Sequence, residues 1–150
     1  MFIELFDEGE KASIYSYRID EGDLEFEKFI FSFIDSKEYV KDYEIINDFI
    51  DRVLSNGAEE RYFRPEGKIR DLLYALPQKG FDCKIRLFCL RVSNSIIILG
   101  NGGVKNTKTY QEDDFLNSIA EEMQKISEKI LYLKKKGSLI CYESEFDFRS

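Results

Sequence analysis

The residues best suited to chemistry lie in the stretch 84–110, KIRLFCLRVSNSIIILGNGGVKNTKTY. It places Arg86 in an apolar segment, followed by a glycine-rich bend and then by Lys105, Lys108 and Tyr110. The chain contains no histidine, which removes the commonest general base and the best zinc ligand. Any chemistry must therefore use Lys, Arg, Tyr, Asp or Glu, and this stretch brings three of those types together.

The charge of the chain changes sign around this stretch. Residues 1–60 contain 17 Asp and Glu against 6 Lys and Arg, whereas residues 61–110 contain 10 Lys and Arg against 3 Asp and Glu. The net charge of the whole chain is −7, so an acidic average conceals a basic middle. A basic block of this kind predicts a local site for an anion, or a surface that an acidic partner covers.

Several classes of site are excluded or disfavoured. Ser-His and Cys-His catalysis are impossible without histidine, and a structural zinc site is disfavoured. The three cysteines, Cys83, Cys89 and Cys141, form no CxxC pair and are expected to be buried thiols. Acidic residues of the DxD type with a following glycine are absent. We therefore expect no metal and no cofactor.

Length and composition favour one globular domain over residues 1–150. The hydrophobic fraction of 43% and the aromatic fraction of 15% argue against disorder. No apolar run approaches the roughly 20 residues that a membrane helix needs. The N-terminal residues lack the basic and apolar regions of a secretory signal, so we expect a cytoplasmic protein.

The first half of the chain predicts a β-hairpin followed by two helices. Residues 2–6 and 13–19 alternate as two short strands, and Asp23 is a plausible N-cap for a helix that continues to Ile34. Ser36 could cap a second helix that ends at Asn56-Gly57. The short connection predicts that the two helices form an αα-hairpin.

The second half predicts strands and one long helix. Segment 59–77 is compatible with a short helix or with a strand and loop, whereas 81–91 and 96–99 are strands. Apolar residues then step by three and four along 112–134, which predicts an amphipathic helix, and 139–148 alternates as a strand. The whole order predicts an α+β domain with a mainly antiparallel sheet.

The middle of the chain resembles the RelE/ParE superfamily of bacterial toxins, in particular its HigB-like, phage-derived branch. Segment 72–80 (LLYALPQKG) stands where that family has its first motif, although the usual Glu-Leu-Arg is missing. Segments 85–90 (IRLFCL), 96–100 (IIILG) and 104–109 (VKNTKT) match the next three motifs in order. The resemblance covers 13–136, with the N-terminal hairpin and the C-terminal strand as additions, and implies a RelE-like fold.

The resemblance implies a toxin that cleaves messenger RNA in the ribosomal decoding site and is neutralised by a cognate antitoxin. In such cleavage a 2′-hydroxyl attacks the adjacent phosphate, and fixed cations stabilise the dianionic intermediate. The resemblance assigns Arg86 to the phosphate, Lys105 and Lys108 to charge stabilisation or base catalysis, and Tyr110 to stacking or proton transfer. It also implies that three further arginines bind the RNA backbone: Arg61, Arg64 and Arg70.

Structural roles remain open for the same residues. Arg86 could pair with an acidic residue of the helices, and Lys105 and Lys108 could protect an edge strand. Tyr110 could cap the long helix. Functionally, a gyrase inhibitor or a repurposed partner-binding module of the same superfamily is the alternative, because fold does not fix function. The acidity of the chain favours that alternative, and the basic segment favours the nuclease.

Overall fold

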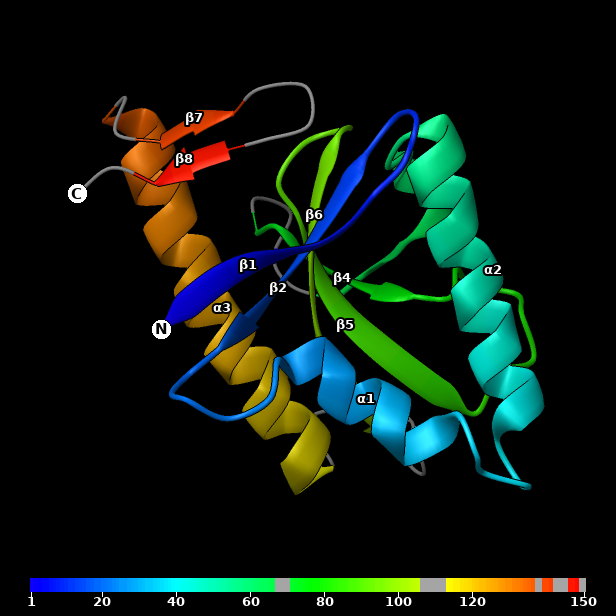
Figure 1. The fold of residues 1–150 in the computed structure, drawn as a ribbon. Helices are drawn as coiled ribbons and strands as arrows, with labels where there is room; N and C mark the ends of the chain where they lie inside the picture. The colour runs from blue at the N-terminus through cyan, green and yellow to red at the C-terminus, as the bar shows by residue number, and fades with distance from the viewer. Residues whose placement is uncertain (67–70, 106–112, 137–138, 142–145, 149–150) are drawn as a thin grey trace.

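A six-stranded mixed sheet forms the centre of the protein (Figure 1). The computed structural model describes residues 1–66, 71–105, 113–136, 139–141 and 146–148. The strand order is β1-β2-β6-β5-β4-β3, in which β2 and β6 are parallel and every other neighbouring pair is antiparallel. The strands are β1 (Phe2–Glu8), β2 (Ser13–Arg18), β3 (Arg64–Pro65), β4 (Leu73–Leu76), β5 (Ile85–Arg91) and β6 (Ile96–Val104).

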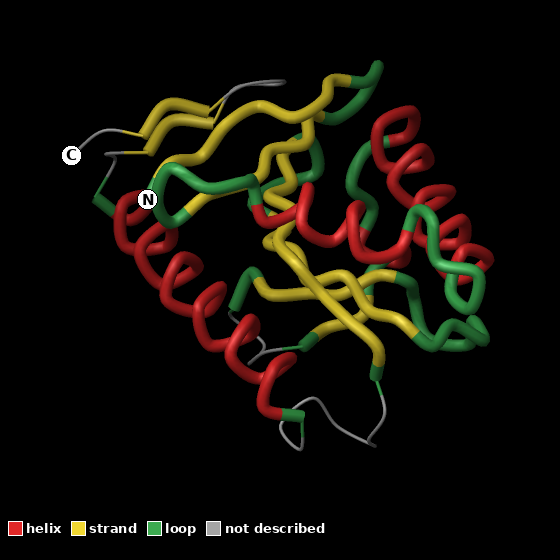
Figure 2. Tube along the Cα trace, turned by 60° about the horizontal axis from the view of Figure 1, so that its bottom comes forward, coloured by secondary structure: helices red, strands yellow, loops and turns green. Residues whose placement is uncertain are grey.

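Helices cover both faces of this sheet (Figure 2). One face carries α1 (Glu25–Phe33) and α2 (Val40–Asn56), and the other carries α3 (Asp114–Lys135). Strand β5 shows why two cores form, because alternate residues point to opposite faces. Leu87 packs in the core beneath α1 and α2, whereas Phe88 and Leu90 pack beneath α3. The central strands are therefore apolar on both sides.

The expected αα-hairpin is wrong. Helix α1 packs over β2 and β6, whereas α2 packs over β5, and the two helices run in different directions (Figure 1). Each helix buries its apolar stripe against the sheet, and Phe29 of α1 lies beside Tyr43 of α2, with ring centroids 6.3 Å apart. Both helices are also shorter at their N-terminal ends than expected, because Leu24 and Tyr39 are the N-caps.

The expectation of a mainly antiparallel sheet is also wrong, because β2 is an internal strand of a mixed sheet. Its polar and apolar residues alternate, and it pairs with β1 as predicted for a hairpin, yet Ser13 and Ser16 are fully buried. The hydroxyl of Ser16 donates to the carbonyl of Leu99 on β6 at 2.8 Å and accepts from the amide of Phe26 on α1 at 3.1 Å. A satisfied hydroxyl can be buried, so alternation of polar and apolar residues did not mean exposure here.

Ser16 is therefore predicted to contribute to stability as a link between β2, β6 and α1. The substitution Ser16→Ala should lower the free energy of unfolding by about 2 kcal/mol, because it leaves a buried amide and a buried carbonyl without this partner. Equilibrium urea denaturation measures the effect. The matched control is Ser32→Ala on the exposed side of α1, where the hydroxyl bonds only to Lys28 of the same helix. Equal losses in both variants would contradict the role given to Ser16.

The long helix agrees closely with the helix predicted over 112–134. Helix α3 spans Asp114–Lys135, and Asp113 caps it by accepting a hydrogen bond from the amide of Leu116 at 3.1 Å. The predicted apolar stripe from Ile119 to Leu133 is confirmed as buried, but Phe115 is 58% exposed and Leu116 begins the stripe instead. At the C-terminal end, the single expected strand is wrong: β7 (Leu139–Cys141) and β8 (Phe146–Phe148) form an antiparallel pair.

The glycine-rich segment, expected to form a bend, lies inside β6. Opposite β5 the register passes from Leu87↔Gly102 to Cys89↔Leu99, so β6 carries one extra residue as a bulge. A Cβ on Gly102 would lie 1.8 Å from the carbonyl oxygen of Arg86, which no side chain can accept. Gly102 therefore permits close approach of β6 to β5 beside Arg86.

Candidate functional site: a cationic cluster on the α3 face of the sheet

Three cations, two on strands and one directly after a strand, lie on the same face of the sheet. Arg64 on β3 is opposite Ala75 on β4, and Ala75 is opposite Phe88 on β5, which packs beneath α3. Arg86 is two residues before Phe88 on β5 and so projects from that face as well. Lys105 follows β6 directly, and its amide donates to the carbonyl of Lys84 at 2.8 Å. Because the preceding residue, Val104, packs against the core beneath α1 and α2, Lys105 is placed on the α3 face. We call Arg64, Arg86 and Lys105 the cationic cluster.

The charges of this cluster act on one another. Burial lowers the pKa of the Arg86 guanidinium, and nearby Arg64 lowers it further. Burial likewise lowers the pKa of Lys105, with a further contribution from Arg86. Like charges held together in a partly desolvated place favour the approach of an anion, because it relieves both their repulsion and their loss of water.

Part of the hydrogen-bonding capacity of the two arginines is unused. The Nη1 atom of Arg86 donates to the carbonyls of Cys83 and Ile85, the second at 2.9 Å. The Nε atoms of Arg64 and Arg86, in contrast, are buried and have no hydrogen-bond partner among the described residues, which is also true of Arg18 on β2. A buried donor without a partner costs about 1–3 kcal/mol. Such donors are typical of a site that an acceptor, for example a phosphate oxygen, completes.

Glu66 adds a carboxyl group to the cluster and was not among the site residues predicted from the sequence. It follows β3, and its amide donates to the carbonyl of Leu73 at 3.2 Å. Burial raises the pKa of its carboxyl group, while Lys105, Arg64 and Arg86 oppose that shift. Its position in a basic segment with only three acidic residues was the one available signal.

The other residues expected at the site lie elsewhere or outside the described ranges. Arg61 is in the short 3₁₀ helix η1 (Glu60–Tyr62), is exposed, and forms an ion pair with Glu59 at 2.7 Å. Its guanidinium lies over the ring of Tyr62, 4.8 Å from the ring centroid. Three further residues, Arg70, Lys108 and Tyr110, lie outside the described residues.

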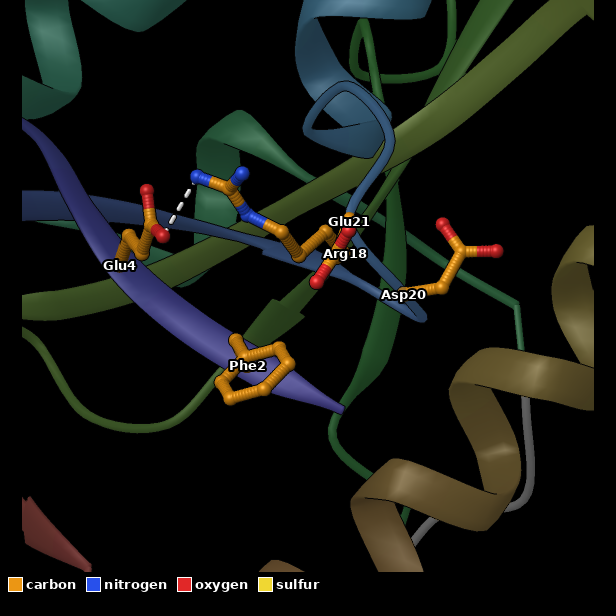
Figure 3. Close-up of a pocket in the computed structure, with 5 residues that line it drawn as sticks. All are labelled: Phe2, Glu4, Arg18, Asp20 and Glu21. Carbon is orange, nitrogen blue, oxygen red and sulfur yellow. Dashed lines mark hydrogen bonds and ion pairs between the residues drawn. The ribbon is translucent and has the colours of Figure 1, made fainter.

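A shallow pocket occurs at the opposite edge of the sheet, beside β1 and β2 (Figure 3). Arg18 lies in it and forms an ion pair with Glu4 at 2.5 Å. Phe2, Asp20 and Glu21 complete the lining, so carboxylates outnumber the single cation. This composition does not suit an anion. The pocket is also separate from the cationic cluster, because β6, β5 and β4 lie between β1 and β2 on one side and β3 on the other.

The described ranges contain neither a metal-binding cluster nor a helix that could span a membrane. No three Asp, Glu or Cys side chains there gather closely enough to hold a metal ion. No helix of those ranges has the length and apolarity that crossing a bilayer requires.

No family model, no curated protein and no solved structure matches the chain. The cationic cluster with Glu66 is therefore the best-supported candidate site.

Proposed function

We propose that this protein is the toxin component of a type II toxin-antitoxin system and cleaves messenger RNA on the ribosome. The observation that carries the proposal is the convergence of Arg64, Arg86 and Lys105 on one face of the sheet. Attack of a 2′-hydroxyl on the adjacent phosphate passes through a dianionic intermediate. Fixed cations in a partly desolvated site stabilise that intermediate more than the singly charged ground state.

The positions of these cations on the sheet support phosphate chemistry. Arg64 and Arg86 belong to strands, and Lys105 directly follows one, so the backbone ladder holds the three positions relative to one another. A preorganised cation loses little free energy in reorganisation when charge develops. Guanidinium groups also match the geometry of two phosphate oxygens, which a single ammonium does not.

The proposal includes the partners and the compartment of the protein. Ribosomes and messenger RNA require a cytoplasmic location, and a cognate antitoxin would neutralise the toxin by binding it. The order of the motifs in 84–110 resembles that of the RelE/ParE superfamily, and this resemblance supports a toxin function. The cationic cluster supports a reaction at a phosphate group.

A second candidate is a non-catalytic, partner-binding protein of the same superfamily, for example a gyrase inhibitor. Strand β1 favours it, because Phe2, Leu5 and Phe6 are exposed and β1 is an edge strand of the sheet. An exposed apolar edge strand is a common docking site for another chain. The acidity of residues 1–60 also disfavours broad contact with ribosomal RNA.

Expression of the chain alone in a bacterial host, with mapping of transcript 5′ ends, tests the proposal. We expect growth arrest with new 5′ ends inside translated frames, and an Arg86→Ala, Lys105→Ala double variant should lose both effects. Arrest without new 5′ ends would favour the gyrase-inhibitor candidate. Normal growth with folded protein in the cell would contradict both toxin functions.

A further inference from the structure

Glu66 carries a carboxyl group whose charge interacts with all three cations of the cationic cluster, and its surroundings are unusual. It lies on the chain two residues after Arg64, and Lys105, Arg64, Arg86 and Lys79 all act on its charge. It is half-buried, and the hydrogen bond from its amide to Leu73 ties its backbone to β4. Leu73, the residue opposite Glu66 on β4, packs in the core beneath α3, so Glu66 projects from the same face of the sheet as the cationic cluster. A carboxyl group beside cations that could bind a phosphate is placed to accept a proton from a neighbouring hydroxyl.

We propose that Glu66 is the general base of this site, removing the proton from the attacking 2′-hydroxyl of RNA. The inference rests on the proposed ribonuclease function and names a residue for its first step. The proton passes to the Glu66 carboxylate while O2′ forms a bond to the adjacent phosphorus. The bond from phosphorus to O5′ then breaks, and Lys105 gives its proton to that leaving oxygen. The products are a 2′,3′-cyclic phosphate and a 5′-hydroxyl end.

Lys105 suits the acid role better than the base role. A lysine has to lose its proton before it can act as a base, and its ordinary pKa is about 10.4. Burial and Arg86 lower the pKa of Lys105, but Glu66 favours its charged form. Lys105 therefore remains a proton donor whose acidity is increased. A donor and an acceptor of protons beside the same phosphate are what a concerted transfer requires.

The acid–base properties of Glu66 fit the base role. An exposed carboxylate is a weak base because its pKa lies far below neutrality. Burial raises the pKa of Glu66 and makes its carboxylate a stronger base, whereas the surrounding cations limit that rise. A base is most effective when its pKa approaches the working pH. The alternative role for Glu66 is that of a counterion that reduces repulsion within the cluster.

Rates of RNA cleavage by Glu66→Gln separate the two roles. Programmed ribosomes carrying end-labelled messenger RNA are mixed with an excess of the protein, and the maximal rate and half-saturating concentration are measured across weakly acidic and neutral pH. As a general base, Glu66→Gln should lower the maximal rate by about 10²–10⁴ with little change in half-saturation. Glu66→Asp, which keeps a carboxylate, should recover part of the rate.

The pH profile gives an independent readout. Because only ionised Glu66 can accept a proton, the wild-type rate should fall as the pH falls through the raised pKa of this group, and Glu66→Gln should lose that dependence. A control is Asp82→Asn, which removes one exposed charge from the same basic segment and should leave rate and profile unchanged. Circular dichroism checks that each variant is folded.

Other outcomes of these measurements would contradict the general-base role of Glu66. A counterion role predicts that Glu66→Gln keeps the wild-type maximal rate and pH profile and binds the anionic substrate more tightly, and this result would overturn the inference. Cleavage by the wild type with an unaffected Glu66→Gln rate would leave the ribonuclease function intact and remove Glu66 alone. No cleavage by the wild type under any condition would overturn both.

Discussion

Replacing Arg86 with alanine should lower the maximal rate of RNA cleavage by about 10²–10³, the usual effect of removing one preorganised donor from an anionic transition state. Arg86 on β5 lies between the other two cations in the strand order, because Lys105 follows β6 and Arg64 is on β3. Its loss removes charge from the middle of the cluster. Single-turnover cleavage on programmed ribosomes measures the effect.

Two matched variants separate this effect from a loss of stability. Arg86→Lys keeps a charge but loses the planar donor pair, so it should recover only part of the rate. Arg52→Ala removes an exposed arginine from α2, on the opposite side of the sheet, and should cleave at the wild-type rate. Wild-type cleavage by a folded Arg86→Ala protein would exclude the cationic cluster from the chemistry.

Replacing Gly102 with alanine should destabilise the protein more than an ordinary surface change, by about 3 kcal/mol. A Cβ at this position would lie 1.8 Å from the carbonyl oxygen and 2.8 Å from the carbonyl carbon of Arg86. Both atoms belong to the backbone of β5, so relief requires β6 to move away from β5. That movement would break ladder hydrogen bonds and shift Arg86. The midpoint of urea denaturation reports the loss.

Gly103→Ala is the matched control, because it is the next residue of the same strand. A Cβ on Gly103 would lie 3.3 Å from the Cδ2 atom of Leu116, a side chain that can move by a few tenths of an ångström. We expect a loss well below that of Gly102→Ala. A Gly102→Ala protein as stable as Gly103→Ala would contradict the close backbone approach described for the bulge.

Much of the local structure could be predicted from periodicity, whereas the packing of the elements could not. Helix α3 was predicted because the apolar residues in 112–134 repeat at helical spacing and so form one continuous buried side of the helix. The same reasoning placed α1 and α2 but not their directions, since an apolar stripe does not say whether it meets another helix or a sheet. Strand β2 and its pairing with β1 were predicted, but its parallel pairing with β6 was not, because the pattern of one strand does not specify its second neighbour.

The candidate site was predictable in part. The basic segment identified Arg64, Arg86 and Lys105, and the pairing of β3 with β4 and of β5 with β6 explains why strands distant in sequence can present them on one face. Glu66 was missed because a single carboxylate carries no spacing signal, and its raised pKa arises from burial that only the fold creates. Arg61 was included on charge alone, although Glu59 already neutralises it.

The most direct test of the account is cleavage of end-labelled messenger RNA by the purified protein in a reconstituted translation system. We predict cleavage that requires the ribosome, leaves 2′,3′-cyclic phosphate and 5′-hydroxyl ends, and disappears in the Arg86→Ala, Lys105→Ala double variant. Intact messenger RNA after prolonged incubation with the folded wild-type protein, or equal cleavage by the double variant, would contradict the assignment of the cationic cluster as a ribonuclease site.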